Sequence, residues 1–207
     1  MRKAVIGMWK TEGQKVTWTH SFLHEILEAI PVNVESLIDV GCGKGIIGAL
    51  VRIYRDASRL VGVDIFKPYL TFCKIHRLYD EIYRIDLRKN PLPFKSNEFE
   101  VATCIEVIEH IPKTNGDKLL KELERISKTV IMTTPAHSTP SKDYDNNPHR
   151  KHVSLWNQQD LQKRGYRVKG VGNYAIPIRN LPINFRHVSS RFPPFFQFLL
   201  AKKEDKG

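Results

Sequence analysis

The chain has 207 residues, of which 41% are hydrophobic, and it carries a formal net charge of +11. Such a chain can bury one proper core, so we expect a single domain over residues 1–207 rather than a disordered or fibrous protein. No apolar run reaches the ~20 residues of a membrane span, and residues 4–9 are too few for the apolar core of a signal peptide. The three cysteines are far apart and form no Cys-x-x-Cys pair, which indicates free thiols in a reducing compartment. We therefore expect a cytoplasmic protein that has no membrane partner.

The positive charge permits an acidic partner, such as nucleic acid or an anionic metabolite. Basic residues are nevertheless spread along the chain, and the one dense cluster is Arg150-Lys151, between His149 and His152. We favour the simpler interpretation, in which the charge serves general solubility.

The first predicted element is an amphipathic helix over residues 16–30, where apolar residues recur at helical spacing. It ends before Pro31 and precedes the first strand, so we expect it to cap the domain. Strands and helices then alternate, which implies a mostly parallel sheet covered on both faces. The predicted strands are residues 36–40, 60–64, 82–86, 101–105, 129–134, 166–171 and 197–202, and the predicted helices are residues 46–54, 68–77, 115–126 and 157–163.

Two long segments break this alternation. Residues 135–154 are polar and rich in Pro, Asn and His, and residues 176–194 contain four prolines and three arginines. A loop of such length in a compact domain usually has a function. The first segment follows the fifth strand, so it should overhang the carboxyl edge of the sheet, where α/β proteins bind ligands. We interpret both segments as flaps on the substrate side, with disordered insertions as the alternative.

The most informative stretch is Leu-Ile-Asp-Val-Gly-Cys-Gly-Lys-Gly at residues 37–45, where an apolar strand leads through Asp39 into a glycine-rich loop. Glycine has no Cβ, so this loop can turn tightly and approach a ligand closely. The dinucleotide fingerprint requires Gly or Ala at position 46, where this chain has Ile46, and the phosphate-loop pattern is also absent. The loop therefore favours a nucleotide-type ligand but not a dehydrogenase.

The pattern Asp-x-Gly-x-Gly-x-Gly resembles the first motif of the class I S-adenosylmethionine (SAM)-dependent methyltransferases. Three later segments fit the same family in the same order. They are residues 60–64, an apolar strand ending in Asp64; residues 85–87, which contain Asp86; and residues 90–104, which resemble the corresponding segment of methyltransferase type 11 domains. This resemblance covers roughly residues 34–172. It implies a Rossmann-like seven-stranded sheet in the order 3-2-1-4-5-7-6, with an antiparallel seventh strand and helices on both faces.

The resemblance also implies a SAM site. Asp39 would approach the cationic methionine end, Asp64 would accept the ribose hydroxyls, and Asp86 would accept the adenine amino group. A helix N-cap is the alternative role for Asp64. Ile65 and Phe66 would flank the adenine ring, and the backbone of Leu87 would contact it. The complete set that the resemblance implies for SAM is Asp39, Gly41, Cys42, Gly43, Gly45, Asp64, Ile65, Asp86, Leu87 and Ile105.

The candidate catalytic residues follow the fourth strand. Glu106, Glu109 and His110 are spaced i, i+3 and i+4, so on a helical turn they share one face. In one interpretation, this Glu-x-x-Glu-His is the fourth motif of the subfamily, and His110 or Glu106 acts as a base or shapes the pocket. In the other, the three side chains bind a divalent metal together with His152 or His149, since small-RNA 2′-O-methyltransferases and ubiquinone-pathway O-methyltransferases use the same pattern as metal ligands.

Oxygen and imidazole ligands suit Mg²⁺, Mn²⁺ or Zn²⁺. We favour the interpretation without a metal, because the His-x-Ser-x-Trp segment at residues 152–156 is also widespread in type 11 domains, where it orders the following helix. The leading hypothesis is a SAM-dependent methyltransferase that acts on an oxygen or nitrogen atom of a small molecule, as a monomer or homodimer. The alternatives are an RNA methyltransferase of the 2′-O type and a non-catalytic partner protein with the same fold. No motif identifies the acceptor.

Overall fold

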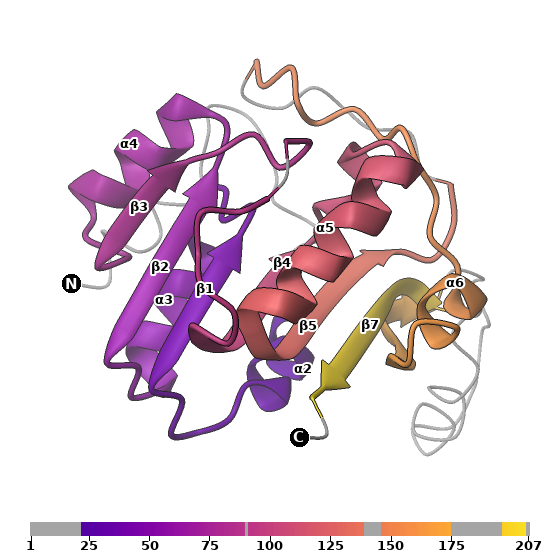
Figure 1. The fold of residues 1–207 in the computed structure, drawn as a ribbon, viewed down its shortest axis with the longest axis horizontal. Coiled ribbons are helices and arrows are strands. Elements are labelled where there is room, and N and C mark those ends of the chain that lie inside the picture. Colours follow the sequence, from indigo (N-terminus) through magenta and orange to yellow (C-terminus); the bar gives the residue numbers. More distant parts are fainter. Residues whose placement is uncertain (1–21, 90, 139–145, 175–195, 206–207) are drawn as a thin grey trace.

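A seven-stranded sheet forms the centre of the structure (Figure 1). The computed structural model describes residues 22–89, 91–138, 146–174 and 196–205. The strand order is β3-β2-β1-β4-β5-β7-β6, and only β7 runs antiparallel to its neighbours. The predicted fold class is therefore confirmed. The strands are β1 (Ser36–Val40), β2 (Arg59–Asp64), β3 (Glu81–Arg84), β4 (Phe99–Ile105), β5 (Ser127–Pro135), β6 (Arg167–Tyr174) and β7 (Phe196–Glu204).

Helices cover both faces of this sheet. They are α2 (Leu23–Ala29), α3 (Ile46–Tyr54), α4 (Lys67–Ile75), α5 (Lys113–Ile126) and α6 (Gln158–Gln162), together with the short 3₁₀ helix η1 (Ile108–His110). Leu37 of β1 packs in the cluster formed with α2, α3 and α4, whereas Ile38 and Val40 pack in the cluster formed with α5 and α6. A strand that is buried on both faces needs apolar residues at successive positions. The burial of β1 on both faces therefore explains the apolar run that precedes the glycine loop.

Most predicted elements lie close to their observed bounds. The third strand is shorter than predicted, because it ends at Arg84 and leaves Asp86 in the turn that follows. Of the predicted helix over residues 16–30, the structure describes α2 from Leu23 onward. Residues 16–21, the predicted flap at residues 176–194 and positions 139–145 of the first flap lie outside the described residues.

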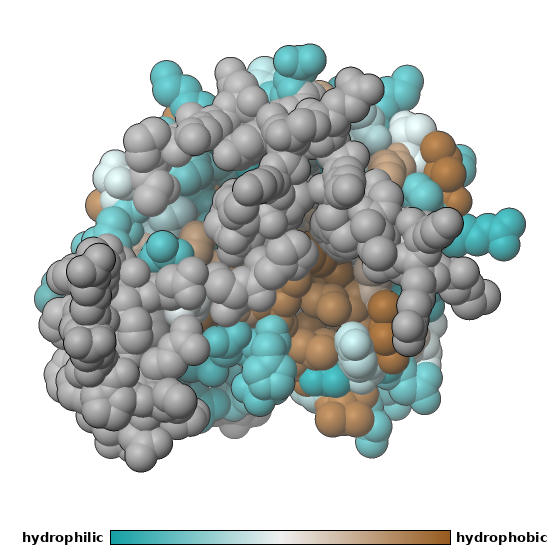
Figure 2. Space-filling model, turned by 180° about the vertical axis from the view of Figure 1, so that it is seen from behind, coloured by the Kyte–Doolittle hydropathy of each residue, from teal (hydrophilic) through white to brown (hydrophobic). Residues whose placement is uncertain are grey.

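Among the described residues, no helix is both long and apolar enough to cross a bilayer. On the face opposite to that of Figure 1, apolar side chains gather near the middle of the view (Figure 2). Ile53 and Tyr54 at the end of α3 are among the exposed large hydrophobic residues. Cys42, Cys73 and Cys104 are buried free thiols, as the sequence predicted.

Candidate active site

The parallel strands β1, β2, β4 and β5 bring their carboxyl ends to one edge of the sheet, where the predicted site residues follow them. The glycine loop after β1 is fixed to β2, because Gly41 N and Cys42 N both donate to the carbonyl of Val63, at 2.8 and 2.9 Å. Gly41, Gly43 and Gly45 all have positive φ, at +79°, +54° and +79°. This left-handed backbone explains why the loop requires glycine at three alternate positions.

The three glycines have different surroundings. A Cβ at Gly41 would lie 2.3 Å from Val107 Cγ2, and a Cβ at Gly45 would lie 2.6 Å from Leu78 Cδ1. A Cβ at Gly43 would meet no atom of the described residues within 4 Å. Gly41 and Gly45 therefore serve close packing, whereas Gly43 borders open space and is the position at which a ligand can approach the loop backbone.

Asp64 joins the glycine loop to the turn after β2. Its Oδ2 accepts a hydrogen bond from Gly43 N at 2.9 Å, and its Oδ1 accepts one from Phe66 N at 2.8 Å. Phe66 is itself the N-cap of α4, and this helix has no side-chain capping hydrogen bond, so the N-cap role that the sequence left as an alternative for Asp64 is not found. The second bond instead closes a turn from Asp64 to Phe66. Each carboxylate oxygen can accept a further hydrogen bond, and Asp64 retains 9% exposure, so the two bonds leave acceptor capacity at the edge of the sheet.

Asp39 lies deeper than the other predicted cofactor residues, with 1% exposure. Its two oxygens accept hydrogen bonds from the hydroxyls of Tyr79 and Thr103, at 2.6 and 2.8 Å. Burial raises the pKa of Asp39 to about 6, although the two hydrogen bonds act in the opposite direction. Asp39 therefore lies beneath the glycine loop as an ordered carboxylate and is not exposed at the open edge.

Asp86 is held by a residue that follows it closely. The Arg88 guanidinium donates to both carboxylate oxygens, at 2.8 Å each, and holds the pKa of Asp86 below its usual range. Leu87 between them is buried. Ile65 and Ile105, which the sequence also assigned to the cofactor, are half-buried at the ends of β2 and β4. The turn after β3 thus presents an ionised Asp86 next to a partly exposed cation.

The segment after β4 does not form the single helical face that the spacing predicted. Glu106 has φ +55°, and the turn at η1 is a 3₁₀ helix that begins only at Ile108. The Glu106 carboxylate accepts a hydrogen bond from Thr133 Oγ1 at 2.8 Å, so it points to β5. The left-handed conformation of a non-glycine residue is unfavourable and is often found at functional sites. Burial raises the pKa of both Glu106 and Glu109.

Glu109 and His110 instead meet His152. Their possible ligand atoms all lie within 4.8 Å of one another, and Glu106 is not in this group. The Oε1 atom of Glu109 is buried and has no hydrogen-bond partner among the described residues, and it lies 4.0 Å from His110 Nε2. The opposite ring nitrogen of His110 lies 3.2 Å from the carbonyl oxygen of Lys151, which can only accept a hydrogen bond. His110 Nδ1 therefore carries the hydrogen, and Nε2 keeps a free lone pair.

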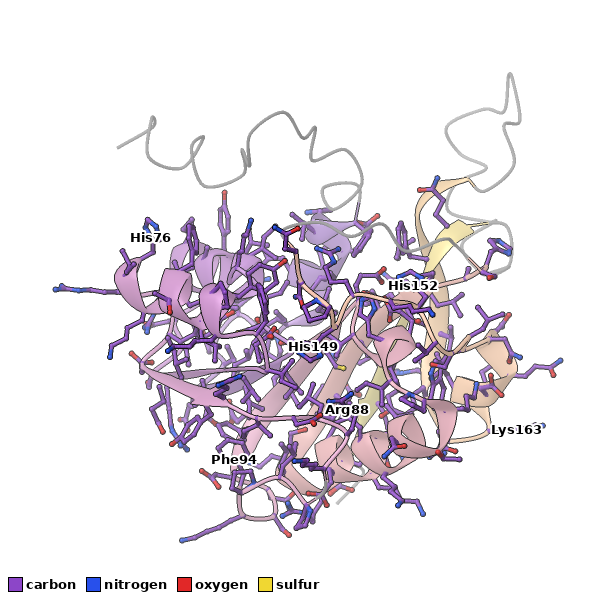
Figure 3. All side chains as sticks on the ribbon, turned by 90° about the horizontal axis from the view of Figure 1, so that it is seen from above. His76, Arg88, Phe94, His149, His152 and Lys163 are labelled. Atoms are coloured by element: carbon purple, nitrogen blue, oxygen red, sulfur yellow. The ribbon has the colours of Figure 1, made fainter. Side chains whose placement is uncertain are left out.

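Burial lowers the pKa of His110 to about 4, so its ring is neutral at physiological pH. A neutral imidazole with a free Nε2 beside an unpaired carboxylate oxygen is an arrangement that can bind a cation or accept a proton from a ligand. Seen from above, His149 and His152 lie on the loop that passes over this edge of the sheet (Figure 3). His149 is not in the group of possible metal ligands.

His152 is positioned by residues 146–156, which we call the strap. Its backbone is bound to η1, since Val153 N and Ser154 N both donate to the carbonyl of Glu109, at 2.8 and 3.1 Å. Ser154 Oγ donates to the carbonyl of Ile108 at 3.1 Å. Trp156 anchors the end of the strap, because its fully buried ring lies against Gly116 of α5, where a Cβ would come within 2.6 Å. The described part of the first predicted flap is therefore a fixed wall of the site.

A pocket opens between the strap and the end of β5. It is lined by Glu109 and His152 together with Thr134, His137, Val153 and Leu155. Thr134 and His137 were not among the predicted site residues, although Thr134 is the last residue of the predicted fifth strand and His137 follows the observed strand by two residues. Tyr79 was not predicted either, and no motif includes it. The pocket adjoins the possible metal ligands and has both polar and apolar walls.

Known methyltransferases resemble this chain in sequence over part of its length and in fold. Residues 38–129 match the family model described as a methyltransferase domain. The ubiquinone biosynthesis O-methyltransferase of Dechloromonas aromatica (strain RCB) is 31% identical over 124 residues, which are 51% of this chain and 51% of that protein. The chain spans about a third to a half of the length of the curated relatives that it matches.

Two solved structures share the fold. The S-adenosylmethionine dependent methyltransferase from Mesorhizobium loti has a TM-score of 0.60 and 16% identity, over 89% of this chain and 97% of that chain. The small RNA methyltransferase HEN1 has a TM-score of 0.62 and 16% identity, over 96% of this chain and 27% of that chain. At this level of identity the likeness concerns the fold.

The different surroundings of the loop glycines lead to a stability prediction. Gly43→Ala and Gly45→Ala both force alanine into a positive φ, which costs about 1 kcal/mol. Only Gly45→Ala also overlaps Leu78, so it should lower the free energy of unfolding by roughly 1–3 kcal/mol more than Gly43→Ala. Urea denaturation of both variants measures the difference, and equal losses would contradict the assignment of Gly43 to open space.

Proposed function

We propose that the chain transfers a methyl group from SAM to an oxygen or nitrogen atom of a small molecule. The proposal starts from the methyltransferase domain of the class I SAM-dependent family, which the chain carries. The proposal rests on the open space next to Gly43, which lies beside the Asp64 carboxylate at the edge of the sheet. The name of the matched Dechloromonas aromatica protein supports an oxygen acceptor.

The residues around this space fit the parts of SAM. Asp64 has acceptor capacity for the ribose hydroxyls, and two hydroxyls that face one carboxylate make a charge-assisted contact. Ile65 and Phe66 offer half-buried apolar surface for the adenine ring. Asp86 is ionised and can accept from the adenine amino group while it remains bound to Arg88. The carboxylates of Asp39, Asp64 and Asp86 together suit a cationic ligand.

The reaction demands little covalent chemistry from the chain. When bound, SAM supplies a methyl group on a sulfonium, which is already an activated leaving group. The chain must hold the acceptor in line, which is chiefly an effect of proximity and orientation. The strap and the end of β5 form the pocket for this purpose, and their backbone contacts to η1 keep its walls fixed. Glu109 Oε1, which has no partner among the described residues, can accept the acceptor's proton in the ionised form of Glu109, and because burial raises the pKa of Glu109 to about 8, this form gains population as the pH rises toward 8.

The role of Asp64 can be tested directly. In Asp64→Asn the amide NH₂ group must face either Gly43 N or Phe66 N, so one of the two loop bonds is lost, together with the charge. We expect the affinity for SAM to fall by about tenfold or more. Isothermal titration calorimetry measures the affinity, circular dichroism checks the fold, and Asp56→Asn on the exposed turn before β2 is the matched control. Unchanged affinity in a folded Asp64→Asn protein would contradict the proposed cofactor site.

We extend the proposal to a divalent cation held by Glu109, His110 and His152. The unpaired Oε1 of Glu109 and the free Nε2 of His110 support it, because a buried polar atom without a partner is rare and costly. When bound, the cation would lower the pKa of a hydroxyl acceptor. Glu106 is outside this ligand set, since its carboxylate is directed to Thr133.

The metal proposal predicts different effects on metal binding for substitutions at Glu109 and at Glu106. Glu109→Gln should weaken Mn²⁺ or Zn²⁺ binding by roughly tenfold or more, because it removes a ligand oxygen, whereas Glu106→Gln should have a much smaller effect. Calorimetric titration of each metal into the two variants gives the comparison. A chelator should also abolish methyl transfer by the unsubstituted protein. Full activity in chelator, or equal effects of the two variants, would exclude this ligand set.

An RNA acceptor is the second candidate, and the basic strap favours it. Burial raises the pKa of Glu109 and the Arg150 guanidinium opposes this electrostatically, so positive charge lies near a residue that lines the proposed acceptor pocket, and Lys151 follows Arg150 in the strap. If RNA is the acceptor, its affinity should fall steeply with salt, and Lys151→Ala should reduce the slope of log K against log[salt] by about 1. A filter-binding titration at several salt concentrations measures the slope. If the filter retains no RNA even at low salt, the RNA acceptor is excluded and the small-molecule acceptor is favoured.

A further inference from the structure

Tyr79 is a buried residue in the short segment between α4 and β3, and no motif of the sequence includes it. Its hydroxyl donates to Asp39 Oδ2 at 2.6 Å and accepts a hydrogen bond from Gly48 N at 3.3 Å. Gly48 lies in the first turn of α3, directly after the glycine loop. One phenol thus connects the carboxylate beneath the loop with the helix that follows the loop.

The Tyr79 ring occupies a slot made by glycines. A Cβ at Gly48 would lie 2.6 Å from Tyr79 Cζ, a Cβ at Gly62 would lie 2.7 Å from Cδ2, and a Cβ at Gly45 would lie 3.2 Å from Cε2. Three glycines from the loop, α3 and β2 therefore leave room for one ring. Because any side chain at these positions would displace it, the ring can take only a narrow range of positions.

The strand register explains how the hydroxyl reaches Asp39. Asp39 of β1 pairs with Gly62 of β2 on one side and with Thr103 of β4 on the other. The three residues therefore form a row across the sheet on one face. Gly62 provides space for the Tyr79 ring, and Thr103 donates to the second oxygen of Asp39. Both oxygens of the carboxylate thus have a donor, which fixes its orientation.

Several groups influence the charge on Asp39. Burial and the nearby Asp64 raise its pKa, whereas the hydrogen bonds from Tyr79 and Thr103 lower it, and the result is about 6. The thiols that interact electrostatically with Asp39 are Cys42 of the loop and Cys104 of β4. A hydrogen bond with Cys73 and burial raise the pKa of Cys42, and burial raises the pKa of Cys104, so both thiols are neutral. The pKa of Asp39 therefore lies about one unit below neutral pH, so Asp39 is ionised there, and the hydrogen bond from Tyr79 helps to keep the pKa at this value.

We propose that Tyr79 is a positioning residue for the cofactor: it keeps Asp39 oriented and charged beneath the glycine loop, so that the carboxylate attracts the ammonium group of SAM. This inference rests on the proposed function, because it assumes that SAM binds at the loop. Tyr79 itself contacts neither the loop's open side nor the pocket, and its effect passes through Asp39.

The test is Tyr79→Phe, which keeps the ring in the glycine slot and removes only the hydroxyl. Without this donor the pKa of Asp39 rises, so Asp39 gains its proton at a higher pH. We expect the affinity for SAM at neutral pH to fall by roughly threefold to tenfold, and the pH at which affinity is lost to move upward from about 6. Calorimetric titrations with SAM between about pH 5 and pH 8 give both quantities.

Tyr83→Phe is the matched control. Tyr83 donates its hydroxyl to Glu81 at the sheet edge and is partly exposed, so its loss should leave the affinity and its pH profile unchanged. Tyr79→Phe should also have no further effect on affinity in an Asp39→Asn background, since the effect passes through Asp39. If Tyr79→Phe does not fold, Thr103→Val removes the second donor and should shift the pH profile in the same direction.

The outcomes separate the two proposals. If the unsubstituted protein does not bind SAM, the proposed function fails and this inference fails with it. If the unsubstituted protein binds SAM and the pH profile of Tyr79→Phe is not displaced, Tyr79 serves packing alone and only this inference is overturned. An equal loss of affinity from Tyr79→Phe with and without Asp39 would also overturn it.

Discussion

The hydrogen bond from Gly43 N to Asp64 is the contact on which the geometry of the site depends. It joins the loop after β1 to the end of β2, and the second Asp64 oxygen fixes the start of α4. The loop backbone is left-handed at three glycines, which adopt positive φ readily but are also free to adopt many other conformations, so the loop needs contacts to hold one shape. One buried carboxylate therefore holds two loops and a helix terminus in place, and it still borders the space where a ligand can bind.

The fold could be predicted largely from local pattern. β1 and α3 lie at their predicted bounds, because an apolar run that enters a glycine loop and then a helical repeat leaves few alternatives. The end of β3 was less certain from sequence. Asp86 follows Ile85 in an apolar context, yet its carboxylate pairs with Arg88 in a turn. Sequence pattern does not encode where strand pairing stops, since this depends on the length of the neighbouring strand.

The segment after β4 was harder to predict for a different reason. The spacing of Glu106, Glu109 and His110 suggests a helical face, but Glu106 has a positive φ and turns toward Thr133. His152 joins the group instead, from a position 42 residues after His110 along the chain. Tyr79 shows the same limit, because its partner Asp39 is distant in sequence and only the pairing of β1 with β2 and of β2 with β3 brings the two together.

The strap has a consequence for how this site could acquire new specificity. It is attached to η1 through the backbone N–H groups of Val153 and Ser154, and its end is fixed by Trp156. The side chains of Val153 and Leu155 are about half exposed and line the pocket. Since main-chain bonds do not depend on which side chain a residue carries, the pocket wall can be rebuilt without loss of its anchor. Directed evolution of the acceptor range would therefore begin at these two positions.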